Sequence, residues 1–158
     1  MPDSAQAFER WLARRLQEIR EEQEPFGAYS PIPGADAREL EAFESRVRSL
    51  FGVELPREYT HFLSVQNGGG QHAGLFGTRT FQLATPSGDV YVDGLVEENL
   101  RLRSNVASFD RLLVYGATDL EYVVQDLATG GFSLRDKTGA GHVGELPDMG
   151  AVIKFALT

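Results

Sequence analysis

The chain contains no cysteine among its 158 residues. Disulfides, thiolate metal sites and cysteine nucleophiles are therefore excluded, and the absence agrees with a cytoplasmic protein. Its apolar runs are far shorter than the roughly 20 residues that a membrane helix needs. Residues 1–6 also lack a basic start followed by an apolar block. The sequence therefore predicts a cytoplasmic location, with neither export nor membrane insertion.

Basic side chains are scarce relative to acidic ones. The chain has 15 Lys and Arg against 23 Asp and Glu, which gives a net charge of −8. Nonspecific nucleic-acid binding depends on cations that displace counterions from phosphates, so this balance argues against it and favours a basic partner. Residues 84–126 hold eight acids and three bases, whereas residues 51–83 and 127–158 are balanced. The middle of the chain therefore carries most of the excess.

Motifs for catalysis and metal binding are missing as well. No Gly-x-Ser-x-Gly elbow marks a nucleophilic serine. The three histidines, His61, His72 and His142, are far apart and lack a second ligand at the spacings that metal sites favour. The glycine-rich run 67–74 lacks the Gly-Lys-Ser/Thr ending of a phosphate loop, which favours a helix stop and a turn. The sequence therefore predicts a protein that is not an enzyme and has no metal or cofactor.

The most specific local pattern predicts a short helix within residues 52–69. Its positions are Leu55, Pro56, Tyr59, Phe62, Leu63, Asn67 and Gly68. Proline suits the first helical turn, where its missing N–H has no partner to lose. The Tyr and the Phe-Leu fall on one helical face, and Asn-Gly offers left-handed backbone after the helix. The segment therefore has a start, a buried face and a stop.

This pattern resembles the signature of the SUKH superfamily, which has a Leu-Pro, a Tyr, a Phe-Leu and an Asn-Gly-Gly at about this spacing. The later segments 113–130 and 153–157 also resemble the second half of that superfamily, in its bacterial YrhA-like branch. The superfamily includes the fungal Smi and Knr cell-wall regulators, whereas its bacterial members are mostly immunity proteins that neutralise a toxin domain. The resemblance covers residues 36–157 and implies a scaffold motif without catalytic residues.

Two helices are predicted before this motif. Residues 4–23 have an amphipathic pattern with Trp11 facing inward and Ser4 as the cap. A proline-rich loop follows at 25–34, because three prolines there prevent the helix from continuing. Asp36 and Glu39 form an approximate capping box for a second helix, which ends before Gly52. The apolar stripe of that helix is Leu40, Phe43, Val47 and Leu50.

The remainder of the chain predicts mostly strands. They are expected near 74–83, 88–92, 111–116, 120–127 and 132–135, with a terminal helix within 147–157. Residues 94–103 fit a short helix, with a strand as the alternative. The prediction is one α+β domain over 1–158, made of an N-terminal helix and Pro-rich loop (1–35) and a SUKH-like region (36–157). Its sheet is expected to be antiparallel or mixed, with about five or six strands.

The acidic middle of the chain is the predicted partner-binding face. It comprises Asp89, Tyr91, Asp93, Glu97, Glu98, Asp119, Glu121 and Tyr122. Acidic groups attract a basic partner over long range, and tyrosines supply desolvated anchors. The alternatives without a binding role are a charged face that contacts only solvent and a core position for both tyrosines. A second candidate segment is the proline-rich loop, with Phe26, Tyr29 and Ile32.

The function hypothesis combines this chemistry with the resemblance. It is a cytoplasmic immunity protein that binds the cognate toxin of a polymorphic or contact-dependent secretion system, without contacting nucleic acid or membrane directly. One alternative is a regulatory protein–protein interaction scaffold like the fungal members. Another is a small-ligand-binding domain or enzyme, which a deep polar pocket beside residues 67–72 would favour.

Overall fold

The structure is a computed structural model that describes residues 4–139 and 141–158, and it has an α+β architecture as predicted. The helices are α1 (Ser4–Gln23), α2 (Ala37–Phe51), α3 (Arg57–Val65), α4 (Leu95–Asn105) and α5 (Met149–Ala156), with short 3-10 helices at Glu24–Phe26 and Ala107–Arg111. The strands are β1 (Gly74–Leu75), β2 (Phe81–Thr85), β3 (Gly88–Val92), β4 (Leu112–Ala117), β5 (Glu121–Asp126), β6 (Phe132–Asp136) and β7 (His142–Leu146). None of the helices in the described part of the chain is long and apolar enough to span a membrane.

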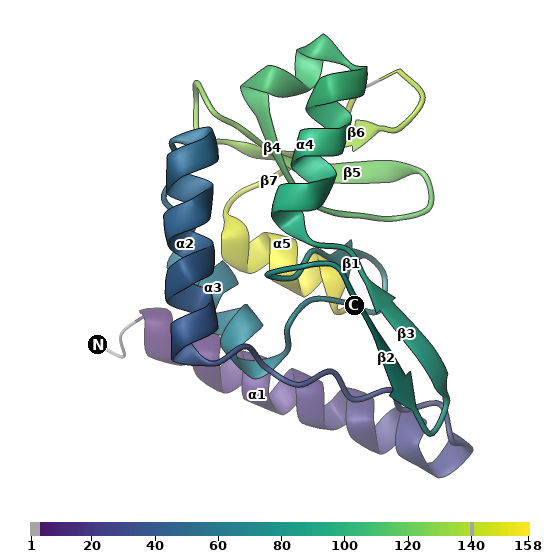
Figure 1. Ribbon diagram of the computed structural model, residues 1–158. Helices are drawn as coiled ribbons and strands as arrows, with labels where there is room; N and C mark the ends of the chain where they lie inside the picture. The colour runs from purple at the N-terminus through teal and green to yellow at the C-terminus, as the bar shows by residue number, and fades with distance from the viewer. Residues whose placement is uncertain (1–3, 140) are drawn as a thin grey trace.

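The strands form two separate antiparallel sheets. The larger sheet has the order β1-β4-β5-β6-β7, and β2 pairs only with β3. Figure 1 shows α4 in front of the larger sheet, while the β2–β3 hairpin extends from the centre of the molecule toward the C-terminal end of α1. The hairpin tip is fixed there by a hydrogen bond between the hydroxyls of Ser30 and Ser87.

The short helix predicted within residues 52–69 is confirmed as α3. Pro56 directly precedes it, and Tyr59, Phe62 and Leu63 are fully buried. The Tyr59 ring meets Tyr115 of β4 edge to face, at a centroid distance of 5.0 Å. The left-handed backbone that follows the helix lies at Gly68 (φ 95°) and the next glycine (φ 81°). This helix therefore connects the N-terminal helices to the larger sheet.

Asn67 has a structural role that the helix pattern did not indicate. Its side chain is buried, and its Oδ1 accepts a hydrogen bond from the Thr78 N–H at 2.9 Å. Its Nδ2 donates to the Thr78 hydroxyl, also at 2.9 Å. The amide therefore holds the turn after α3 against the segment that leads into β2.

The two N-terminal helices occur as predicted, with local corrections. Ser4 is itself helical in α1 and is therefore not its cap, while Trp11 packs against the core and is half-buried. Asp36 caps α2 by accepting from the Glu39 N–H at 2.8 Å, but the Glu39 carboxylate pairs with Arg79 instead of completing the capping box. Leu50, at the end of the predicted stripe, is 46% exposed because the helix has turned it away from the core.

The C-terminal half differs from the prediction in its strands. The short helix expected over 94–103 forms as α4, which begins at Leu95, whereas the predicted strand 74–83 is divided into β1 and β2. The division arises because Phe76 N–H donates to the Tyr115 carbonyl at 2.8 Å and Thr78 is held by Asn67, so the chain bends between the two sheets. Strand β7 was not predicted, and its mostly exposed residues lack an alternating apolar pattern. Helix α5 forms as predicted, with Asp148 as its cap.

Candidate functional site

A groove of about 630 Å³ lies between α1, residues 28–32, the turn after α3 and β3. We call it the α1–β3 groove, and its lining includes Leu16, Arg20, Tyr29, Ile32, Gln71 and Tyr91. Its volume falls within the range of about 300–1,000 Å³ that is typical of ligand sites. The groove is therefore the first candidate for a binding site.

The lining of the groove is mainly apolar surface and uncharged hydrogen-bonding groups. Arg20 is the one charged residue among the described lining residues, and its guanidinium pairs with Glu24 at 2.7 Å. This hydrogen bond raises the pKa of Arg20. The Gln23 amide donates to Gln71 Oε1 and so joins α1 to the turn. Such a surface suits amide groups or apolar side chains, and the described lining residues provide no carboxylate or imidazole as a general acid or base.

The glycine-rich turn beside this groove directs its N–H groups into the protein. Gly69 N–H donates to the Leu75 carbonyl at 2.8 Å. The N–H groups of Gln71 and His72 both donate to the Ala156 carbonyl, at 2.8 and 2.9 Å. A phosphate loop needs such donors free to face an anion. The turn therefore anchors α5, in agreement with the helix-stop reading of its sequence.

The predicted binding residues on β3 are exposed. Tyr91 is 72% exposed, so the core alternative is wrong for this tyrosine, and Asp89 and Asp93 are also exposed. Asp89 accepts a hydrogen bond from the Gln82 side chain of β2 at 2.9 Å. Two of the three residues, Asp89 and Tyr91, lie on the strand itself, and Asp93 follows its end.

A second part of the predicted face forms a paired cluster at α4. Glu98 Oε2 lies 2.7 Å from the Arg101 guanidinium, which also interacts with the Tyr122 hydroxyl. Burial raises the pKa of Asp93, the nearby Glu98 raises it further, and Arg101 opposes both effects. Tyr122 is half-buried against Phe109, with ring centroids 5.7 Å apart. The structure therefore brings together Asp93, Glu98 and Tyr122, but with a cation that neutralises part of their charge.

The remaining predicted residues lie elsewhere. Glu97 pairs with Arg46 of α2 at 3.3 Å, although it is adjacent to Glu98 in the sequence. Asp119 lies in the turn between β4 and β5, and Glu121 opens β5, where it accepts a hydrogen bond from Thr118. The eight predicted residues thus occupy several places on the fold, and of them Tyr91 lines the groove, with Asp89 and Asp93 two residues away on either side in the chain.

The two segments weighed separately in the sequence meet at the α1–β3 groove. Tyr29 and Ile32 come from the proline-rich loop, and Tyr91 comes from the acidic segment. Tyr91 lies about 60 residues from the other two in the chain, so no local pattern indicated that all three line one groove. Phe26, at the start of the same loop, is 85% exposed. One surface therefore combines aromatic side chains from both candidate segments with the acids of β3.

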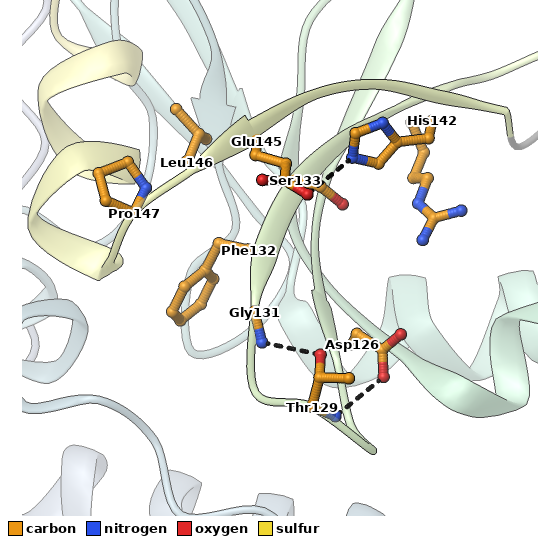
Figure 2. A pocket seen from close by; sticks show the side chains of 10 residues that line it. Asp126, Thr129, Gly131, Phe132, Ser133, His142, Glu145, Leu146 and Pro147 are labelled. Atoms are coloured by element: carbon orange, nitrogen blue, oxygen red, sulfur yellow. Dashed lines mark hydrogen bonds and ion pairs between the residues drawn. The ribbon is translucent and has the colours of Figure 1, made fainter.

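Another pocket, of about 470 Å³, lies along β6 and β7 (Figure 2). Its polar groups mainly stabilise the β5–β6 turn: Asp126 Oδ1 accepts from the Thr129 N–H, and Thr129 Oγ1 accepts from the Gly131 N–H, both at 3.2 Å. His142 lies 3.8 Å from Glu145 at the other end of the pocket. Phe132, which lines this pocket, is half-buried, whereas Tyr91 of the groove is exposed.

The histidines are dispersed in the fold. His61 lies near Glu9, His72 packs edge to face on Phe155, and His142 is on β7. Across residues 4–139 and 141–158, no group of three or more His, Asp or Glu side chains is placed to hold a metal ion. The absence of a cofactor stays a prediction of the sequence.

Comparison with protein families and with curated sequences gives no relative for this chain. No protein-family model matches it, and no similar sequence is found among curated proteins. The functional argument therefore depends on the residues and their arrangement.

Proposed function

We propose that this protein is a non-catalytic, SUKH-like immunity protein that binds and neutralises the toxin domain of a polymorphic or contact-dependent secretion system in the cytoplasm. The observation that carries the proposal is the exposed acid–tyrosine–acid sequence at β3, beside a groove lined by aromatic and apolar side chains. This arrangement joins long-range attraction for a basic protein to a local anchoring surface.

The two parts of the surface contribute in different ways. A toxin that cleaves nucleic acid needs a cationic cleft, and an acidic surface accelerates association with such a cleft by orders of magnitude. Tight binding also needs a few desolvated side chains, for which tyrosine is favoured. Tyr91 is 72% exposed and has apolar groove surface beside it, so a partner that covers it removes both from water. The acids therefore set the association rate, and the tyrosine with the groove sets the lifetime of the complex.

A small-ligand-binding domain is the second candidate, and the location of the α1–β3 groove favours it. The groove borders Gln66, Gly69, Gly70 and Gln71, and a deep polar pocket beside residues 67–72 is the feature that would favour a ligand binder. Its uncharged amides and hydroxyls suit a neutral polar molecule. Such a ligand would fill the groove without needing the acids of β3.

Co-expression with the product of the adjacent upstream reading frame tests the proposed function. We expect the wild-type protein to restore growth and to form a stoichiometric complex in isothermal titration calorimetry. Tyr91→Ala should weaken the complex by roughly tenfold or more, as truncation of a central aromatic anchor does. The matched control is Val143→Ala on β7, which is 54% exposed and lies at an edge of the other sheet, and it should bind like the wild type.

The outcome separates the candidates. Growth that is not restored, together with no detectable complex, contradicts the immunity function. Saturable binding of a small molecule that Gln71→Ala abolishes and Asp89→Asn leaves unchanged would favour the ligand-binding candidate instead.

A further inference from the structure

Strand β3 has an open backbone edge. A two-residue turn, Pro86-Ser87, joins β2 to β3, so the closing pair Thr85↔Gly88 must exchange its own N–H and C=O groups. Hydrogen-bonded pairs then recur at every second position, at Leu83↔Val90 and Phe81↔Val92. The backbone groups of the intervening residues, Asp89 and Tyr91, therefore point away from β2.

This edge is unpaired over a short stretch only. Within the part of the chain that the structure describes, no backbone hydrogen bond joins Asp89 or Tyr91 to another segment on that side. Further along, Gly77 N–H donates to the Asp93 carbonyl at 2.9 Å, and Gly77 forms a parallel bridge with Gly94. The edge is thus open at Asp89 and Tyr91 and closed from Asp93 onward. Tyr91 also lines the α1–β3 groove, so space adjoins the open stretch.

The charged side chains on this stretch are all acidic. Asp89, Tyr91 and Asp93 occur at alternate positions, which in an extended chain places them on the same face. All three are exposed. Residues 80–100 contain four acids and no lysine or arginine. Pairing β3 with a second copy of itself would bring these carboxylates together, so the charge disfavours self-association and favours a basic segment.

We infer that β3 is a docking strand, to which an extended segment of the toxin adds with Lys or Arg placed opposite Asp89 and Asp93. The inference rests on the proposed function and specifies how its partner is held. The segment would form up to about four backbone hydrogen bonds with Asp89 and Tyr91, as in other cases of strand addition. Its basic side chains would meet Asp89 and Asp93, and the residue between them would pack on Tyr91 at the groove.

Proline substitution tests the backbone contribution separately from the side chain. Tyr91→Pro removes the outward N–H and places a ring at the pairing edge, whereas the hydrogen bonds to β2 come from neighbouring residues and persist. We expect Tyr91→Pro to weaken binding of the adjacent-gene toxin domain by roughly tenfold or more beyond Tyr91→Ala. The matched control is Gln82, the cross-strand neighbour, where Gln82→Pro and Gln82→Ala should bind alike because they alter the opposite edge.

Amide hydrogen exchange of the wild-type protein provides a second measurement that does not depend on a substituted chain folding. The Asp89 and Tyr91 amides should exchange rapidly in the free protein and at least roughly tenfold more slowly in the complex. If the complex forms while Tyr91→Pro matches Tyr91→Ala, or while both amides still exchange rapidly, strand addition is wrong and the proposed function stands. If the wild-type protein forms no complex with the toxin domain, the proposed function fails and the docking strand fails with it.

Discussion

Replacement of Asn99 offers a sharp test of how α4 is joined to the larger sheet. Asn99 is 1% exposed, and its side chain reaches from α4 to β4. Its Oδ1 accepts from the Val114 N–H and its Nδ2 donates to the Val114 carbonyl, both at 2.8 Å. Strand β1 pairs with β4 at Gly116 and Ala117, and Phe76 after it reaches the Tyr115 carbonyl, so the amide acts in place of a longer neighbouring strand at Val114.

The expected cost follows from the two backbone groups that lose their partner. In Asn99→Ala, the N–H and C=O of Val114 stay buried without these hydrogen bonds. Each unsatisfied buried group costs about 1–3 kcal/mol, so the free energy of unfolding should fall by roughly 2–6 kcal/mol. The whole free energy of unfolding of a domain is about 5–15 kcal/mol, so this loss would be a large part of it. Asn99→Leu should be comparably destabilising, because it restores apolar volume but no hydrogen bond.

Urea unfolding followed by circular dichroism measures this loss as a lower midpoint at an unchanged slope. The control is Asn105→Ala, at the exposed end of the same helix, which should stay within about 0.5 kcal/mol of the wild type. An Asn99→Ala protein as stable as this control would refute the reasoning.

Asn99→Asp adds a pH test of the same contact. An ionised carboxylate can accept from the Val114 N–H, but it also faces the Val114 carbonyl and is buried, so its pKa should be raised in the folded state. The folded protein then binds more protons than the unfolded chain between the two pKa values. The free energy of unfolding of the variant should therefore lie closest to that of the wild type at low pH. The deficit should grow as pH rises through the raised pKa of the folded state.

Two further predictions concern other parts of the fold. Tyr59→Ala should lower the free energy of unfolding by roughly 3 kcal/mol or more, since it empties a fully buried site. Tyr59→Phe should lower it by about 1–3 kcal/mol, because the Phe76 carbonyl loses its hydrogen-bond donor. Urea titration of both variants measures these losses, and a fully stable Tyr59→Ala would contradict the role of α3. Hydrogen bonds from Thr138 lower the pKa of Asp136, so this carboxylate stabilises the fold above its unfolded pKa and the contribution disappears as pH falls through its folded pKa. Asp136→Asn should therefore be less stable than the wild type near neutral pH and equal to it at low pH in a urea series, whereas a constant difference at every pH would argue against the effect.

The helices were predictable because their start, buried face and end lie within a few neighbouring residues. Asp36 and Gly52 bound α2, and Pro56 with Tyr59 and Phe62 defines α3. The strands were harder to locate, because pairing partners are distant in the chain. Strand β7 has a glycine in its middle and mostly exposed side chains, so it exists chiefly because β6 pairs with it.

The sequence alone determined the α+β class, the helices, the acidic character of the middle of the chain and the absence of cysteine chemistry, since each depends on composition or on residues within a few positions. It indicated Tyr91 and the proline-rich loop only as separate candidates. The tertiary structure decided that they meet at one groove, that Glu97 and Glu98 pair with different helical cations, and that β3 has an open edge. These features join segments separated by tens of residues, and their positions depend on long-range packing and strand pairing that no local pattern encodes.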